Sequence, residues 1–120
     1  MTTKTTNALR AKRCVACEGE ATRLSKPQAR ELLASLEGWK MDENATQIRK
    51  QWKMDNFAAG LDFFQRVGDL AEQEGHHPDV HLTGYRNVAI ELSTHAVDGL
   101  SENDFILASK IDELPAGEQT

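Results

Sequence analysis

The chain of 120 residues has a formal net charge of −5 and is 39% hydrophobic, which suits one domain with a modest core and argues against wholesale disorder. Its Lys and Arg residues are scattered, which argues against nucleic-acid binding, because that needs clustered positive charge. No apolar run approaches the ~18 residues of a membrane span, and residues 1–13 lack the apolar stretch of a secretory signal, so we expect a cytoplasmic protein.

A CxxC motif formed by Cys14 and Cys17 lies in residues 1–24, a polar stretch without periodicity that we expect to be a flexible leader. Such a motif can supply half of a zinc site or a redox pair. No second cysteine pair completes a zinc site, and the motif does not open a helix beside a βαβ pattern. We therefore interpret the two cysteines as a reduced pair without an essential role.

The first predicted helix begins after Ser25, where Pro27 and Gln28 complete a typical N-terminal pattern. Gly38 is expected to end it. Its buried stripe consists of Leu32, Leu33 and Leu36.

Two strands are predicted next, joined by a turn at residues 42–45. Trp39 and Met41 alternate with charged residues in the first of them. One face of the second carries Ile48, Lys50, Trp52 and Met54. Because Lys50 interrupts this apolar face, the sheet is expected to be covered in part, or the lysine stem to reach solvent.

The longest predicted helix is capped by Asp55 and ends near Gly75. Its core-facing stripe is expected to hold Phe57, Leu61, Phe64 and Gly68, widened by Phe63, Val67 and Leu70. A hairpin of strands at 80–82 and 88–92 follows, with its turn at 83–86. The last helix begins at Ser101, ends before Pro115 and is buried through Phe105, Ala108 and Ile111.

The element order α-β-β-α-β-β-α predicts an α+β fold, because hairpins joined by helices build an antiparallel sheet. We expect a four-stranded antiparallel sheet with three helices packed on one face. Residues 25–114 form this domain, and residues 115–120 are a polar tail.

All four histidines lie between positions 76 and 95, and histidine is the simplest acid or base near neutral pH. Gly75 lets the helix stop, and Pro78 biases His77 toward an extended conformation. His95 lies at the end of the fourth strand. Antiparallel pairing of the third and fourth strands therefore predicts that His76, His77 and His95 converge on one pocket. Three unrelated histidines remain the alternative.

A metal site is the other interpretation of the histidines. His77 and His81 are four residues apart, but in extended chain this separates their Cα atoms by roughly 13 Å, too far to share one ion easily. We therefore expect no metal and interpret His81 as a surface histidine.

The stretch with Glu72, His76-His77-Pro78, Tyr85, His95 and Asp104 resembles the signature of the pterin-4a-carbinolamine dehydratases. The strings EGHHPDV, STH and GLSENDF match that signature as they stand, and the resemblance covers residues 25–113. It implies a hydro-lyase that dehydrates 4a-hydroxytetrahydropterins to quinonoid dihydropterins, with no metal and no bound cofactor. An aromatic amino acid hydroxylase is then expected in the same pathway.

The resemblance also implies a pterin site formed by Gly75, His76, His77, Ser93, Thr94, His95 and Ala96. Family members often carry Asp or Glu where Gly75 stands, so only a backbone role transfers to this position. Dehydration needs one proton delivered to the departing hydroxyl and one removed from a ring nitrogen. Our hypothesis is that His77 and His95 transfer these protons and that His76 binds and orients the pterin.

Four further residues are candidates for supporting roles. Asp104 either caps the last helix with Ser101 or supports the site. Glu72 either orients the His76 imidazole from one helical turn away or is an ordinary surface residue. Tyr85 is either a wall of the pocket or a packing aromatic, and Pro78 shapes the chain after the histidines.

A binding protein on the same fold is the alternative function. Some members of the family that the chain resembles act as dimerisation partners of a transcription factor, and divergent relatives assist assembly of a large carbon-fixing enzyme. The complete histidine set favours catalysis. A free sheet edge and the resemblance both lead us to expect a homodimer or homotetramer.

Overall fold

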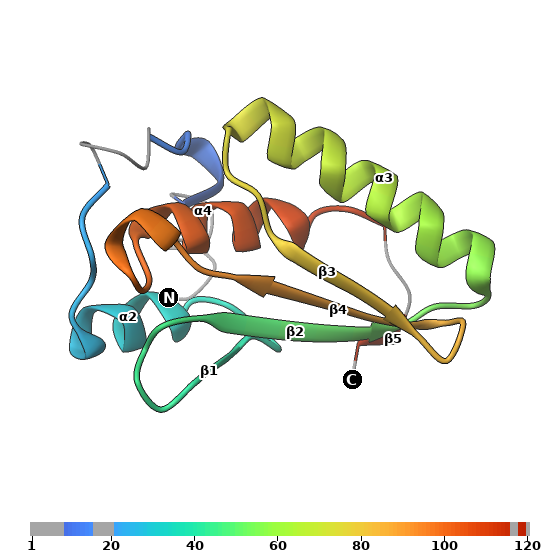
Figure 1. Cartoon of the computed structure of the whole chain (residues 1–120), viewed down its shortest axis with the longest axis horizontal. Helices are drawn as coiled ribbons and strands as arrows, with labels where there is room; N and C mark the ends of the chain where they lie inside the picture. The colour runs from blue at the N-terminus through green and yellow to red at the C-terminus, as the bar shows by residue number, and fades with distance from the viewer. Residues whose placement is uncertain (1–8, 16–20, 116–117, 120) are drawn as a thin grey trace.

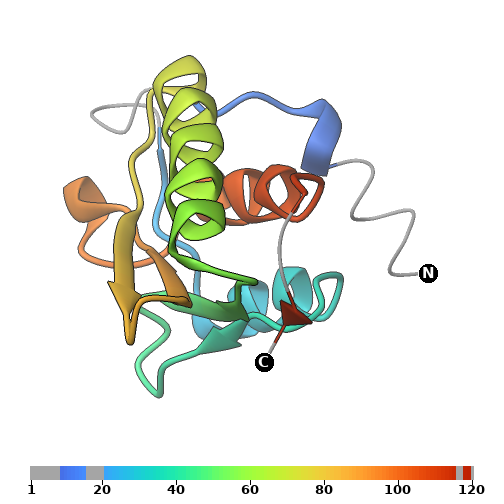
Figure 2. The same ribbon diagram turned by 90° about the vertical axis from the view of Figure 1, so that its right-hand side faces the viewer.

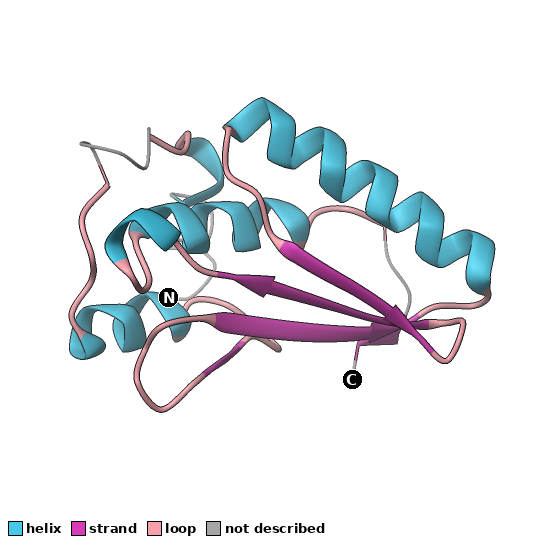
Figure 3. Ribbon diagram, viewed as in Figure 1, coloured by secondary structure: helices cyan, strands magenta, loops and turns pink. Residues whose placement is uncertain are grey.

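The protein is an antiparallel sheet with its helices gathered on one side, as Figures 1 and 2 show. A computed structural model describes residues 9–15, 21–115 and 118–119. The strand order is β1-β2-β4-β3, and the short β5 pairs with β2. The elements, coloured by type in Figure 3, are α2 (Lys26–Leu33), β1 (Lys40–Met41), β2 (Ile48–Lys53), α3 (Phe57–Glu74), β3 (Asp79–Thr83), β4 (Asn87–Leu92), the 3-10 turn η1 (His95–Val97), α4 (Glu102–Ile111) and β5 (Glu118–Gln119).

These elements confirm the predicted α+β class, element order and four-stranded antiparallel sheet. The strand β5 is an addition within residues that we expected to be a polar tail. Among the described residues, no helix has the length and apolar character that crossing a membrane requires.

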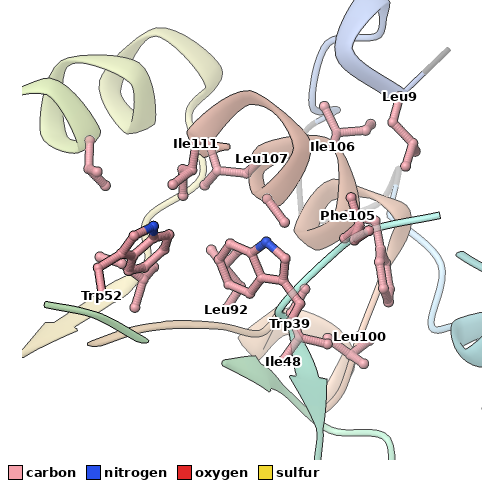
Figure 4. Packing of buried hydrophobic residues seen from close by; sticks show 14 of the residues in the cluster. Leu9, Trp39, Ile48, Trp52, Leu92, Leu100, Phe105, Ile106, Leu107 and Ile111 are labelled. Atoms are coloured by element: carbon pink, nitrogen blue, oxygen red, sulfur yellow. The ribbon is translucent and has the colours of Figure 1, made fainter. Parts of the chain in front are cut away.

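The core lies between the sheet and α4. Figure 4 shows Trp39 and Trp52 beside Leu107 and Ile111 of α4. The rings of Trp39 and Trp52 meet edge to face, with centroids 5.9 Å apart. Every residue of α4 from Asn103 to Ser109 is buried. This helix is therefore the central element of the fold, and the polar groups that it carries inward need partners.

The apolar face of α3 confirms our prediction at Phe63 and Val67 but not at Phe57 and Leu61. Its buried residues are Gly60, Phe63, Val67 and Ala71, whereas Phe57 and Leu61 are 51% and 49% exposed. Gly60 lies against β3, where a Cβ atom would approach Leu82 to 3.2 Å. Gly60 therefore lets the helix approach β3 closely, and Phe57 and Leu61 stay exposed whereas Phe64 packs partly against the core.

Two helix boundaries also differ from the sequence interpretation. Asn56 rather than Asp55 caps α3, and its side chain accepts the Ala59 N–H at 2.8 Å. At the start of α2, Ser25 and Gln28 form the predicted capping box. That helix ends at Leu33, before Gly38, because the chain continues in tighter turns.

Lys50 is buried, with 2% of its surface exposed. Our expectation that the sheet is only partly covered at Lys50, or that the lysine stem reaches solvent, is therefore wrong. Its Nζ donates to Asp112 Oδ1 at 2.8 Å and to the Glu37 carbonyl at 3.0 Å. A buried ammonium group is tolerated only when it is paired in this way. Asp112 also accepts from Trp39 Nε1 at 3.1 Å.

Part of the predicted flexible leader packs onto the domain. Leu9 is 2% exposed and belongs to the hydrophobic core. Cys14 is a free, half-buried thiol, while Cys17 lies outside the described residues. Burial and the nearby Glu74 carboxylate raise the pKa of Cys14 to about 12. The thiol therefore stays protonated at neutral pH, as expected of a reduced cysteine without a reactive role.

Candidate active site

His76 lies immediately beyond α3 in a fixed turn. Gly75 caps the helix with a φ of 66°, a left-handed conformation that glycine adopts readily. The His76 N–H then donates to the Ala71 carbonyl at 3.2 Å, which ties the residue back to the last turn of α3. The His76 side chain is 4% exposed. The chain thus turns inward at this histidine.

Asp104, in the first turn of α4, is the centre of a buried hydrogen-bond network. Its Oδ1 lies 2.6 Å from His76 Nε2. Its Oδ2 accepts from the Thr94 hydroxyl at 2.8 Å and from the Ser101 N–H at 3.0 Å. The Thr94 and Ser101 hydroxyls are themselves 2.7 Å apart. One carboxylate therefore joins the turn after α3, the segment after β4 and the start of α4.

Asp104 makes the contacts that both of its considered roles require, and its support of a catalytic site stays a prediction. It forms a capping box with Ser101, and it also bonds the His76 ring. Its side chain is completely buried, at 0% exposure. A carboxylate in the first turn of a helix also faces the positive end of the helix dipole.

His77 is exposed and interacts with Glu72. Its side chain is 64% exposed, and its Nε2 pairs with the Glu72 carboxylate. With regard to the two alternatives for Glu72, its contact is with His77 rather than with His76, and the carboxylate lies on the surface. Because α3 ends at Glu74, the chain leaves the helical path at Gly75, and it is His77 that reaches back over the last turn.

His95 is exposed and lies in η1, not in a strand. The strand β4 ends at Leu92, and a bridge between Thr94 and Gly99 closes a small loop that holds His95. Thr94 N–H donates to the Gly99 carbonyl at 2.8 Å, which pins the base of this loop.

His77 and His95 are related through Asp104. Each of them directly follows a residue that is hydrogen-bonded to this carboxylate, His76 in one case and Thr94 in the other. The network therefore fixes the backbone from which both exposed imidazoles project. That the three histidines serve one substrate stays a prediction.

A groove of about 380 Å³ lies between α3 and β3 beside His77. Glu72, His77, Pro78 and the exposed Val80 form its end nearest the histidines. The rest of its lining comes from one side of α3: Phe64, Gln65, Val67, Gly68, Asp69 and Ala71. It offers apolar walls with a few polar groups, the composition usual for small-molecule sites.

The remaining predicted site residues are placed differently. Ser93 and Ala96 are exposed on either side of Thr94 and His95, whereas the Thr94 hydroxyl is occupied by Asp104 and Ser101. Gly75 has open space where a Cβ atom would stand.

Tyr85 does not join the histidines within the chain. It sits in the turn of the β3–β4 hairpin, beyond the pair Thr83 and Asn87, while Asp79 next to the histidine segment pairs with Glu91 at the other end. The length of β3 alone separates these ends by about 13 Å.

The sequence did not indicate which residues form hydrogen bonds with Asp104. Ser101 was recognised only as a cap, and Thr94 only as a possible substrate contact. In the described parts of the chain, no group of three or more His, Cys, Asp or Glu side chains could hold a metal ion.

Comparison with known proteins places the chain in a family. A family model described as pterin 4 alpha carbinolamine dehydratase matches residues 22–114. The Arabidopsis thaliana protein named pterin-4-alpha-carbinolamine dehydratase 2, mitochondrial, is 50% identical over 109 residues, which cover 88% of this chain and 58% of that protein. The chain thus spans less than two thirds of that relative. A candidate pterin-4-alpha-carbinolamine dehydratase of Methylococcus capsulatus is 41% identical over 109 residues, covering 91% of this chain and 95% of that protein.

Two solved structures are similar to the chain. A transcriptional coactivator/pterin dehydratase of Brucella melitensis superposes with a TM-score of 0.70 at 28% identity, covering 76% of this chain and 96% of that one. A pterin dehydratase-like protein described as a RuBisCO assembly factor in the alpha-carboxysome superposes with a TM-score of 0.53 at 22% identity, covering 63% of this chain and 87% of that one. The second likeness shows a shared fold.

Proposed function

The chain belongs to the pterin 4 alpha carbinolamine dehydratase family, and from this premise we propose that it removes water from a 4a-hydroxytetrahydropterin to give a quinonoid dihydropterin. The observation that carries the proposal is the network around Asp104, which fixes the backbone beside two exposed imidazoles. Exposed histidines held on a rigid base are suited to proton transfer near neutral pH.

The reaction breaks the bond between the ring carbon and the hydroxyl group, which leaves as water after it gains a proton, while a ring nitrogen loses one. We assign these two transfers to His77 and His95, because both rings are open to a ligand. Glu72 would hold the His77 ring in position.

His76 is assigned the orientation of the pterin. Its ring is held by Asp104 and is almost buried, so it can present only an edge to a ligand. Gly75 directly precedes His76, and the exposed Ser93 and Ala96 flank Thr94 and His95 in the sequence. We assign further contacts with the pterin to the Gly75 backbone and to these two residues. The groove beside Glu72, Pro78 and Val80 has room for a small ring system.

An absorbance assay of carbinolamine dehydration tests the proposal. We expect the protein to accelerate the reaction over the buffer rate, and His77→Ala and His95→Ala each to lower kcat by ~10²–10⁴-fold, the usual contribution of a proton transfer. His81→Ala is the matched control, since His81 is also an exposed histidine but lies on β3 in a pair with Glu91. It should keep its activity within about twofold of the unmodified protein.

Folded protein that gives only the buffer rate would contradict the dehydratase proposal and favour a binding or assembly role on the same fold. Normal turnover of His77→Ala together with inactive His76→Ala would reverse the assignment of these two histidines. A substitution that lowers activity through misfolding is recognised by circular dichroism of the same sample.

The proposal extends to assembly and context. We propose a homodimer or homotetramer, supported by the exposed Phe57 and Leu61 on α3 and by the edge strand β3 with its exposed Val80. Light scattering measures the oligomeric state, and a monomer at assay concentration would contradict it. We also propose a cytoplasmic location and an aromatic amino acid hydroxylase as the source of the substrate.

A further inference from the structure

Residues 9–15, the strap, cross the ends of two helices close to the candidate site. Figures 1 and 2 both show this blue segment passing between α4 and the C-terminal end of α3. The family match begins at residue 22, so the strap lies outside it. Its CxxC cysteine, Cys14, has no part in the proposed reaction.

Consecutive residues of the strap bind the neighbours of the two central site residues. The Cys14 N–H donates to Glu74 Oε1 at 2.8 Å, and Glu74 lies two residues before His76. The Val15 N–H donates to Asn103 Oδ1 at 3.0 Å, and Asn103 Nδ2 donates back to the Val15 carbonyl at 2.8 Å. Asn103 directly precedes Asp104.

The two domain side chains that bind the strap are buried. The Glu74 side chain is 4% exposed and Asn103 is 2% exposed. Lys110 Nζ donates to the second oxygen of Glu74 at 2.6 Å, which links α3 to α4 directly. Buried polar groups keep their positions only while their partners are present, so loss of the strap would leave Glu74 and Asn103 short of hydrogen bonds.

The strap also completes the C-terminus of α3. The last turn of this helix contains no basic residue. Arg13 Nη2 donates to the Gln73 carbonyl at 3.4 Å, which brings a positive charge to the negative end of the helix dipole. At the other end of the strap, Leu9 is buried in the core and Arg10 Nε donates to the Ser109 carbonyl at 3.1 Å.

We propose that the strap is a positioning element of the candidate active site: through Glu74 and Asn103 it holds the end of α3 against the first turn of α4, and so holds His76 against Asp104. The strap itself touches no reacting group. The activity readout of this proposal rests on the proposed function, whereas its spectroscopic readout does not.

The test compares Val15→Pro with Val15→Ala in the full chain. Proline removes the N–H that Asn103 accepts and places its ring carbon there, whereas alanine keeps the N–H and shortens a side chain that is 44% exposed. Undocking is measured by the reactivity of Cys14 toward a thiol reagent at pH 8, in a Cys17→Ser background so that one thiol remains. Cys14 should react slowly in Val15→Ala and much faster in Val15→Pro.

The site is read out in two ways. The contact of 2.6 Å between His76 Nε2 and Asp104 must contain a hydrogen, whose exchange with solvent NMR can follow. We expect slow exchange in Val15→Ala and fast exchange in Val15→Pro. In the dehydration assay, Val15→Pro should lower kcat by roughly 10-fold, the scale of a small misplacement of reacting groups, with KM changed by less than about twofold.

A second substitution, Asn103→Ala, removes both bonds to Val15 from the helix side, and Lys12→Ala breaks only the exposed pair with Glu102 as a further control. The proposal is overturned if Val15→Pro or Asn103→Ala frees Cys14 while the exchange of the His76 proton and kcat stay as in the controls. It is equally overturned if neither frees Cys14, since the bonds to Val15 then do not hold the strap. An unmodified protein without dehydratase activity would contradict the proposed function alone, because proton exchange at His76 still decides this proposal.

Discussion

The two ends of α4 each carry an aspartate that accepts hydrogen bonds from distant parts of the chain; Asp104 is fully buried and Asp112 is mostly buried. At the N-terminal end, Asp104 binds the His76 ring, the Thr94 hydroxyl and the Ser101 N–H. At the C-terminal end, Asp112 binds Lys50 and Trp39. The same side chain on the same helix thus closes two separate clusters.

The clusters differ in what holds the negative charge. Asp104 faces the positive end of the helix dipole, and its partners are an imidazole ring, a hydroxyl group and a backbone N–H. Asp112 lies at the negative end of the dipole and is matched by the Lys50 ammonium group. Exposed histidines follow directly after two partners of Asp104, whereas no histidine neighbours Lys50 or Trp39 in the sequence. One cluster can therefore serve chemistry, and the other serves stability.

Breaking the pair at the C-terminal end should give the largest change in stability. Lys50→Ala leaves the Asp112 carboxylate without its cation in a mostly buried position. We expect the free energy of unfolding to fall by about 4 kcal/mol, the usual cost of removing one member of a buried pair. Urea unfolding measures this, and turnover per folded molecule should stay within about twofold. A fall in turnover with normal folding would erase the distinction between the clusters.

At the N-terminal end, Asp104→Asn should affect stability and activity together. The amide retains one acceptor but cannot serve His76, Thr94 and the Ser101 N–H at once. We expect a loss of about 2 kcal/mol in unfolding free energy and roughly a 10-fold loss in kcat. Urea unfolding and the dehydration assay measure the two effects. Unchanged kcat in a destabilised protein would make this cluster structural as well.

Removing both charges at the C-terminal end should have a small effect. In Lys50→Met/Asp112→Asn the apolar stem is kept and the amide oxygen can still accept from Trp39 Nε1. Because a buried pair replaced by uncharged groups of similar volume is often neutral, we expect a change of about 1 kcal/mol or less. Thermal unfolding compares this variant with Lys50→Ala. A double variant as unstable as Lys50→Ala would show that the ion pair itself stabilises the fold.

Acid should act in opposite directions on two carboxylates, Glu74 at the end of α3 and Asp112 at the end of α4. Burial would raise the pKa of Glu74, but hydrogen bonds from Lys110 and Cys14 outweigh it and lower the pKa below the usual 4.5. Its stabilising contribution is therefore present above pH 4.5 and is lost as the pH falls through the lowered pKa. Burial raises the pKa of Asp112 above 3.8 despite its bonds from Lys50 and Trp39. Its contribution is full below pH 3.8 and is lost as the pH rises through the raised pKa.

Urea unfolding between pH 6 and pH 3.5 separates these effects. The advantage of the unmodified protein over Glu74→Gln should shrink toward acid, whereas its stability relative to Asp112→Asn should grow. Parallel curves for the two variants would contradict the assigned directions.

Short-range patterns predicted much of the fold. Ser25 with Gln28 and Ser101 with Asp104 identify helix starts, since each cap is formed within three residues. The alternation at 88–92 identified β4. In α3, however, two apolar stripes run along the helix, and only its packing on β3 decides that the one through Phe63 is buried.

The candidate site was predicted in part. Clustering in the sequence identified the three histidines, but their exposure depends on contacts across the fold. His76 is buried by Asp104, which is 28 residues away, and Lys50 finds Asp112 at a distance of 62 residues. One of the two alternatives for Glu72 paired it with His76, but its contact is with His77, because helical spacing does not continue past Gly75. Local periodicity contains no information about such partners.

Asp104 both caps α4 and closes a buried hydrogen-bond network, which affects how relatives of this protein can be interpreted. A residue that closes a helix start and a buried network is retained by selection for folding alone, even in a lineage that has lost catalysis. His77 and His95 are exposed, so folding alone places little constraint on them. Under the proposed proton transfers, the exposed pair rather than the aspartate would separate an enzyme from a protein that has kept only the fold.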